Sequence, residues 1–287
     1  MANITAAMVK ELREMTDAGM MECKKALQEA EGDMEKAVDV LRTRGLAAVA
    51  KKAGRATNEG TVATVLNTTC TRGAMVELNC ETDFVAMNDK FKAYANKIAM
   101  AALDSSVENV DELKAATYEG ETVDAIVTDA IHVMGENTQI ARVTTVEGDG
   151  VATYIHGGGK IGVLVVFGLE GIDAASDAFQ AYGRDIAMQV AAANPVAANR
   201  DMVDAAVIEH EKSIYMAQAA ESGKPEAIQE KMAEGRMEKF FKENVLTEQA
   251  YVKNPDESVQ QYTDATAKEL GGSIVIKDFK RFVLGGE

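Results

Sequence analysis

The sequence has no tryptophan and only 3 prolines among its 287 residues, and it lacks long apolar runs. No run reaches the roughly 20 apolar residues that a membrane-spanning helix needs. The N-terminal stretch also lacks the continuous apolar segment of a signal peptide. We therefore expect a cytoplasmic protein that has no membrane partner. Alanine-rich amphipathic stretches dominate instead, so helix should outweigh strand.

Basic residues are in deficit as well, since 30 lysines and arginines face 46 acidic residues and the net charge is −16. A protein that binds the phosphate backbone of a nucleic acid needs a basic face that displaces counterions. The composition therefore argues against direct nucleic-acid binding. The acidity itself indicates only solubility and charge steering.

Few residues have side chains suited to metal or redox chemistry. The 3 cysteines are Cys23, Cys70 and Cys80, and the 3 histidines are His132, His156 and His210. The cysteines form no CxxC pair and no histidine lies three or four residues from another, so we expect neither a metal site nor a cofactor. The cysteines should be reduced, as in a cytosolic protein. His132 should be a satisfied packing residue on an apolar helix face.

Residues 1–46 show the pattern of three short helices. Apolar residues recur at helical spacing, and Gly19 and Gly32 interrupt the pattern. Asp33 is a good N-cap for the third helix. We therefore predict an N-terminal three-helix domain over residues 1–54, which leads through a linker into the rest of the chain.

An α+β pattern follows and occurs twice. The first copy, predicted over residues 55–148, has a hairpin (61–69 and 74–80, with its turn at 71–73), helices at 85–103, 110–117 and 123–134, and a strand at 139–147. The second copy, predicted over residues 149–287, has a hairpin (151–155 and 161–169), a helix at 175–193 and a closing strand at 273–284. The letters FKAY at 91–94 and FQAY at 179–182 fall in one register. This agreement favours a duplication over chance similarity between two alanine-rich helices.

The second copy also holds a helical arm, predicted at about residues 198–245. Alternate spacings of four and three separate Val203, Val207, His210, Ile214 and Ala217. A turn at residues 223–225 then leads into a second helix at 226–243. A stripe this short favours packing within the arm over a dimer seam.

Residues 156–160, His-Gly-Gly-Gly-Lys, suggest a phosphate-binding loop at first sight. Such a loop joins a strand to a helix and carries Ser or Thr after the lysine. Here Ile161 follows, and the next element is a strand. The pattern therefore favours a hairpin turn with His156 exposed at its tip, and no nucleotide site.

The end of the first hairpin is the most informative segment. Cys80 could act as a nucleophile near a helix N-terminus, but no base stands at a recognisable spacing, so a small apolar role at a strand end is favoured. Thr82 or Asp83 can cap the next helix. Phe84 could pack inward, or it could project as an aromatic wedge into a partner's pocket. Spacing does not decide between these two roles of Phe84.

Two long motifs resemble the signatures of the elongation factor Ts family: residues 12–27 (LREMTDAGMMECKKAL) and 77–86 (ELNCETDFVA). Shorter matches at 134–137 (MGEN), 156–164 (HGGGKIGVL) and 222–225 (SGKP) extend the resemblance over essentially the whole chain. The sequence departs from the family pattern at Asp17, Met87 and Lys160. The short C-terminal helical module of some members also has no counterpart, which puts in doubt any partner contact made through it.

The resemblance implies a guanine-nucleotide exchange factor for elongation factor Tu, which acts in translation elongation by protein–protein contact and not as an enzyme. The element formed by Thr82, Asp83, Phe84 and Val85 would disturb the partner's Mg²⁺ and phosphate contacts, so that GDP leaves and GTP can bind. Further partner contacts are implied for Met20, Met21, His156 and Gly157. The N-terminal domain resembles a ubiquitin-associated fold. The arm resembles the family's dimerisation region, which makes a homodimer a candidate.

Two other functions are compatible with the residues alone. An adaptor would bind a partner through the N-terminal helices without accelerating GDP release. A cysteine hydrolase would use Cys80 and would turn over its substrate with no partner present. The three functions differ in whether GDP release from elongation factor Tu is accelerated.

Overall fold

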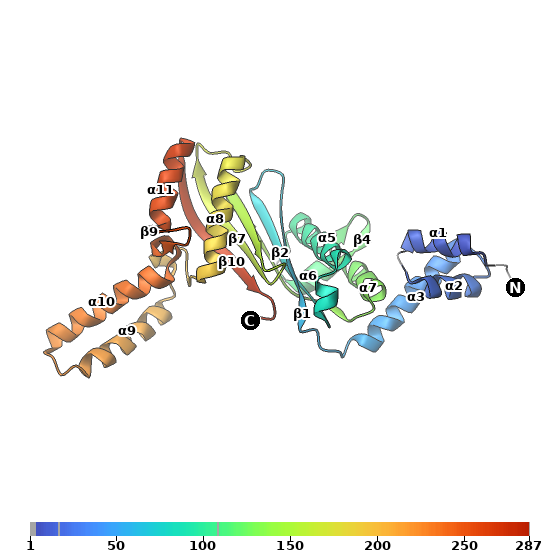
Figure 1. Ribbon diagram of the computed structural model, residues 1–287, viewed down its shortest axis with the longest axis horizontal. Coiled ribbons are helices and arrows are strands. Elements are labelled where there is room, and N and C mark those ends of the chain that lie inside the picture. Colours follow the sequence, from blue (N-terminus) through green and yellow to red (C-terminus); the bar gives the residue numbers. More distant parts are fainter. Residues whose placement is uncertain (1–3, 17, 108, 287) are drawn as a thin grey trace.

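The computed structural model describes residues 4–16, 18–107 and 109–286, apart from the side chains of residues 46–51. Three helices form the N-terminal part, as predicted: α1 (Ala6–Thr16), α2 (Met20–Glu29) and α3 (Met34–Lys52) (Figure 1). They enclose a small apolar cluster of their own. Asp33 caps α3, since its Oδ1 accepts the Lys36 N–H at 3.1 Å. Asp17, a departure from the family pattern, lies outside the described residues.

The first sheet has the antiparallel order β1–β2–β5, formed by β1 (Glu59–Leu66), β2 (Arg72–Cys80) and β5 (Thr138–Glu147). The predicted turn at 71–73 is wrong, because Arg72 and Gly73 already belong to β2. The turn lies at residues 67–71, where the Asn67 side-chain oxygen accepts the N–H groups of Thr71 and Arg72 at 2.9 and 3.0 Å. An asparagine that bonds to the following backbone in this way is a turn signal.

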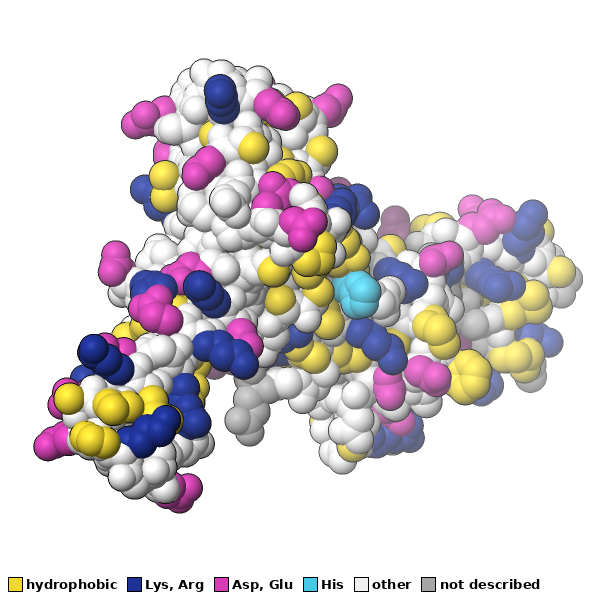
Figure 2. Space-filling model, turned by 60° about the vertical axis from the view of Figure 1, so that its left-hand side comes forward, with side chains coloured by type: hydrophobic (Ala, Val, Ile, Leu, Met, Phe, Trp, Pro, Cys, Tyr) yellow, Lys and Arg dark blue, Asp and Glu magenta, His cyan; other side chains and the backbone are white. Residues whose placement is uncertain are grey.

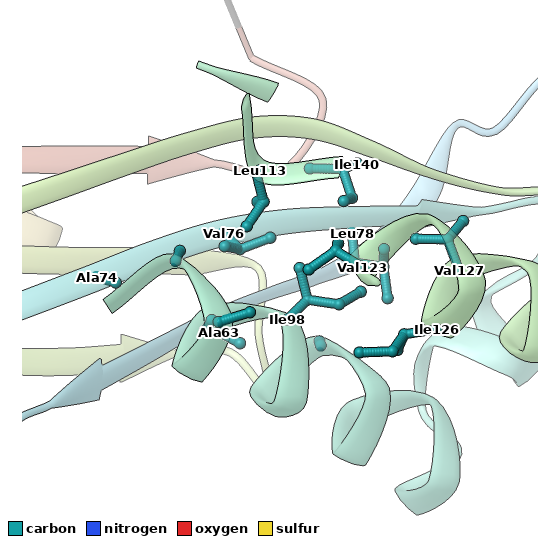
Figure 3. Packing of buried hydrophobic residues seen from close by; sticks show 14 of the residues in the cluster. Ala63, Ala74, Val76, Leu78, Ile98, Leu113, Val123, Ile126, Val127 and Ile140 are labelled. Carbon is teal, nitrogen blue, oxygen red and sulfur yellow. The ribbon is translucent and has the colours of Figure 1, made fainter. Parts of the chain in front are cut away.

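Helices cover one face of this sheet: α4 (Asp83–Ala86), α5 (Asp89–Ser105), α6 (Val110–Ala115) and α7 (Val123–Met134), with the short pair β3 (Thr117–Tyr118) and β4 (Glu121–Thr122) between α6 and α7. The single helix predicted at 85–103 is wrong. The chain leaves the helix at Met87 and restarts at Asn88, whose extended backbone and side chain cap α5 through the Lys90 N–H at 2.9 Å. Figure 3 shows Ile98 of α5 packed among Val76 and Leu78 of β2 and Ile126 of α7.

The second sheet repeats this connectivity in the order β10–β7–β6, with β6 (Gly150–His156), β7 (Ile161–Glu170) and β10 (Ser273–Val283). Its covering helices are α8 (Asp177–Ala193) and α11 (Val259–Leu270). The sequence patterns did not predict α11. Its signal is nonetheless present, because Ser258 and Gln261 form a capping box. The short pair β8 (Ala250–Tyr251) and β9 (Asn254–Ser258) precedes it.

The two copies match in packing as well as in order. Phe91 and Phe179 are both fully buried, and so are Ile98 and Ile186. The sheets face each other through a separate apolar cluster formed by Val62, Met75, Val151 and Leu164. The layers of the core therefore run helices, sheet, sheet, helices (Figure 1). The mixed α+β class is confirmed, whereas the boundaries 1–54, 55–148 and 149–287 stay predictions.

An antiparallel helical arm projects from the second copy, formed by α9 (Ala205–Ala220) and α10 (Glu226–Asn244) (Figure 1). At its base, the short helical turns η1 (Arg200–Met202) and η2 (Leu246–Glu248) meet, and Arg200 binds Glu238 and Glu248. Hydrophobic and basic side chains lie side by side on the arm, at the lower left of Figure 2.

The stripe predicted along the first arm helix is not its packing face. Of the five stripe residues only Val203, before α9, is buried, while Val207 and His210 are exposed. Ile208 and Tyr215 pack against the apolar cluster of α10 instead, and Ala219 is fully buried. Apolar residues are spread around α9, so spacing alone selected a face one position away from the correct one.

Candidate functional site

The segment from Thr82 to Val85 follows β2 closely: Thr82 belongs to the connection, and Asp83, Phe84 and Val85 belong to α4. Thr82 has an extended backbone (φ −128°, ψ 154°), and its Oγ1 accepts the Val85 N–H at 3.4 Å. Thr82 is therefore the N-cap, one of the two caps that the sequence left open. Val85 is half-buried and Ala86 is buried against the first core.

Because α4 turns Val85 and Ala86 inward, Asp83 and Phe84 point away from the core. The Phe84 side chain is 81% exposed, more than any other large hydrophobic residue described in the structure. So little of this side chain is covered that it contributes little to the stability of the chain itself. Of the two roles that the sequence left open for Phe84, inward packing is excluded and projection remains.

Cys80 has the opposite environment. It is fully buried, and its thiol donates to the carbonyl oxygen of Thr82 at 3.2 Å. Burial, assisted by the negative charge of Glu136, raises the pKa of the Cys80 thiol to about 12. The thiol therefore stays protonated at neutral pH, which does not suit a nucleophile. The small apolar role at a strand end fits the geometry better.

The segment that follows α7 holds the connection between β2 and α4 in place. Glu136 accepts hydrogen bonds from Glu81 and Thr82, and Glu81 accepts one from the Asn137 N–H at 2.7 Å. This N–H group, together with Arg55, holds the pKa of the Glu81 carboxyl below its ordinary value. The sequence patterns missed Glu136 as a site residue, because it lies 54 residues from Thr82 along the chain.

The glycine-rich turn after β6 is a second exposed element. Gly157, Gly158 and Gly159 all have positive φ (61°, 70° and 110°), and β7 begins directly after Lys160. The turn is therefore the predicted hairpin turn and joins two strands. A Cβ atom at Gly159 would lie 2.0 Å from the Thr61 Oγ1, so only glycine fits against β1.

His156 and Gly157 are exposed at this turn, as expected. The Tyr154 hydroxyl lies 3.2 Å from the His156 Nδ1. The Gly159 carbonyl accepts the Val62 N–H of β1 at 2.7 Å, which ties the second copy to the first. Since α4 also packs on β1, the glycine turn and Phe84 belong to one continuous part of the core.

Met20 and Met21 lie on the N-terminal three-helix part and not on the core. Met20 and Met21 begin α2 and are 59% and 63% exposed, because α2 turns Cys23, Ala26 and Leu27 inward. Met15 at the end of α1 is exposed to the same extent, at 60%, and was not singled out from the sequence. The three-helix part contacts the core where α3 packs against α7 (Figure 1).

A cleft of about 630 Å³ separates α1 and α3 from α7, and His132 is among its lining residues. His132 was predicted to be satisfied by packing. This prediction is wrong for its ring, because the buried Nε2 has no hydrogen-bond partner in the described part of the chain. Gly45 of α3 lies against His132 and Thr128 of α7, so the two helices approach closely at this point.

All three cysteines carry free thiols. Within residues 4–16, 18–107 and 109–286, no three His, Cys, Asp or Glu side chains are placed to hold a metal ion. Of the helices in the part of the chain that is described, none combines the length and apolarity that crossing a bilayer requires.

Comparison with known proteins gives a consistent result over nearly the whole chain. The family model described as elongation factor TS matches residues 81–286. The elongation factor Ts of Trichlorobacter lovleyi is 50% identical over 288 residues, which cover 98% of this chain and 93% of that protein. The elongation factor Ts of Clostridium botulinum (strain ATCC 19397 / Type A) is 47% identical over 287 residues, which cover 98% of this chain and 92% of that protein. That of Clostridium perfringens (strain SM101 / Type A) is 47% identical over 285 residues, with 98% and 93% covered.

Proposed function

Because this chain belongs to the elongation factor Ts family, we propose that it is the guanine-nucleotide exchange factor for elongation factor Tu. It acts in the cytoplasm during translation elongation and works by contact with its partner. The observation that carries the proposal is Phe84, an aromatic side chain 81% exposed at a connection whose backbone is fixed by hydrogen bonds.

Phe84 is the wedge of the proposed mechanism. Burying a phenylalanine side chain in a partner's pocket contributes about 1.5–3 kcal/mol. That free energy becomes available only where the partner opens a pocket beside its nucleotide. Asp83, exposed next to Phe84, brings a negative charge to the same place, and together they disturb the elements that hold Mg²⁺. Weaker Mg²⁺ and phosphate contacts then release GDP.

The exchange follows from thermodynamic coupling between two ligands of one protein. This protein binds nucleotide-free elongation factor Tu more tightly than the GDP-bound form. It must therefore weaken the binding of GDP to elongation factor Tu by the same ratio by which GDP weakens its own binding. No covalent step is needed, which agrees with the protonated state of the Cys80 thiol. GTP then binds the emptied site.

The other exposed elements supply affinity. Met20 and Met21 present flexible apolar side chains on the three-helix part, and such side chains adapt to a partner surface. His156 and Gly157 extend the contact to another domain of elongation factor Tu. The methionine surface also supports a second candidate function, an adaptor that binds through the three-helix part and leaves the nucleotide in place.

Release of fluorescently labelled GDP from elongation factor Tu, measured by stopped flow with and without this protein, tests the proposal. We expect acceleration that saturates with the concentration of the factor. Binding without acceleration would support the adaptor and refute the exchange function. The same titration with GDP-loaded and nucleotide-free elongation factor Tu should show tighter binding to the nucleotide-free form.

A further inference from the structure

We propose that Glu136 is a positioning residue for nucleotide exchange: its carboxylate fixes the connection that carries Phe84. This inference rests on the proposed function and assigns Glu136 a role that it exerts through Phe84. Its basis is a set of contacts between two segments that lie more than 50 residues apart in the sequence.

The Glu136 carboxylate receives three hydrogen bonds from the connection between β2 and α4. Its Oε2 accepts the backbone N–H groups of Glu81 and Thr82 at 3.1 and 3.0 Å. Its Oε1 accepts the Thr82 hydroxyl at 2.7 Å. Hydrogen bonds to an ionised acceptor are shorter and roughly twice as strong as those between neutral groups. The two oxygens of the Glu136 carboxylate thus bind two successive residues, Glu81 and Thr82.

Glu136 is itself held from both sides. Gly135 before it ends α7 with a left-handed backbone (φ 78°) that turns the chain toward the connection. Asn137 after it donates its backbone N–H to Glu81 at 2.7 Å and its side-chain amide to the Arg55 carbonyl at 2.8 Å. The two segments thus exchange hydrogen bonds, and each contributes a carboxylate that accepts from the backbone of the other.

The hydrogen bonds of Glu136 affect the position of Phe84 through the Thr82 hydroxyl. A hydroxyl donates one hydrogen bond and can also accept, and that of Thr82 donates to Glu136 and accepts from the Val85 N–H. The helix α4 has only 4 residues, and so short a helix is not stable by itself. Its orientation depends on this cap and on the inward packing of Val85 and Ala86. Phe84, exposed as it is, has no packing of its own to hold it.

A fixed connection matters because ordering a loop during binding costs free energy that a preset loop avoids. If Glu136 sets the position of Phe84, removing the Glu136 carboxylate should slow the step in which Phe84 enters the partner. Contacts made by the three-helix part and by the glycine turn would remain. The maximum rate of GDP release should therefore fall more than the affinity for GDP-loaded elongation factor Tu.

The test measures stopped-flow GDP release at saturating factor for the full chain and for Glu136→Ala, Glu136→Gln and Glu269→Ala. We expect Glu136→Ala to lower the limiting rate by about tenfold, which corresponds to about 1.4 kcal/mol. Glu136→Gln should keep most of the limiting rate of the unaltered protein. A glutamine oxygen can accept both N–H groups, and the glutamine amide can donate to the Thr82 hydroxyl. Glu269→Ala, at an exposed position on α11, removes the same charge and should change nothing.

A double-mutant cycle with Phe84→Ala decides whether Glu136 acts through Phe84. In the Phe84→Ala background, Glu136→Ala should cause little further loss. Additive losses, or a wild-type limiting rate in Glu136→Ala, would overturn the inference while leaving the exchange function intact. Failure of the unaltered protein to accelerate release would overturn both. Should Glu136→Ala not fold, Thr82→Val removes the linking hydroxyl at nearly constant volume, and the same non-additivity with Phe84→Ala is required.

Discussion

Replacing Phe84 by alanine should separate stability from exchange. A fully buried phenylalanine cut to alanine costs about 3–5 kcal/mol of unfolding free energy. Phe84 is 81% exposed, so the change should stay within the roughly 0.5 kcal/mol that is usual for surface positions. For a chain of this size the melting midpoint should then move by about 2 °C or less.

The loss in exchange should be much larger. If Phe84 is buried in elongation factor Tu when GDP leaves, its removal forfeits about 1.5–3 kcal/mol. Since 1.4 kcal/mol is a factor of ten, the limiting rate of GDP release should fall by roughly 10- to 100-fold. Affinity for elongation factor Tu should survive in part, because Met20, Met21 and the glycine turn are untouched.

Phe91→Ala is the matched control, because Phe91 is fully buried on α5 in the same copy of the core. It should lose about 3–5 kcal/mol of stability and keep a normal exchange rate per folded molecule. Thermal unfolding and stopped-flow GDP release are measured on the same preparations. A large stability loss in Phe84→Ala together with a normal rate would show that Phe84 packs inward in solution, and the assignment of the wedge would be wrong.

Three further changes test which parts of the chain contribute to partner binding, oligomeric state and stability. Deleting residues 1–54, which keeps Arg55 and its hydrogen bond from Asn137, should leave a folded core with weakened binding, and unchanged affinity by calorimetry would refute this. Replacing the arm, α9 and α10, by a short linker should alter oligomeric state or stability more than the exchange rate, and loss of exchange by a folded armless protein would count against it. Glu77 is 1% exposed and binds both Arg142 and the Gly285 N–H, so Glu77→Ala should cost about 3–5 kcal/mol in denaturant unfolding; a cost below 1 kcal/mol would contradict this.

The sequence predicts an element well where its apolar spacing and the residues at its ends indicate the same limits. The predicted limits of α7, Val123–Met134, match the structure because Thr122 caps its start and Gly135 ends it. The hairpin of the second copy was equally clear, since three glycines separate two runs rich in β-branched and aromatic residues. In both cases local chemistry and tertiary packing favour the same answer.

Predictions went wrong where a single polar side chain overrode the apolar period. Asn88 divides one expected helix into α4 and α5 through its bond to the Lys90 N–H, and Asn67 moves the first hairpin's turn by several residues. The division at Asn88 limits α4 to 4 residues, so the helix that carries Phe84 is a single turn.

Glu136 could not have been found from periodicity, because its partners are backbone N–H groups far away in the sequence. The candidate positions Met20, Met21, His156 and Gly157 were suggested by resemblance alone. Their exposure in the structure is compatible with partner contacts, and those contacts stay predictions. A contact made by one or two exposed residues leaves no periodic signal in the sequence.

The duplication provides an internal comparison for the connection that carries Phe84. In the second copy, the corresponding connection between β7 and α8 packs Ile172 on the second core and buries Ala174. There Ser176 caps α8 directly, with no short helix between. The fold can therefore close this junction without exposing an aromatic side chain. Since the same topology forms without an exposed aromatic side chain, this comparison supports the proposal that Phe84 contacts a partner protein.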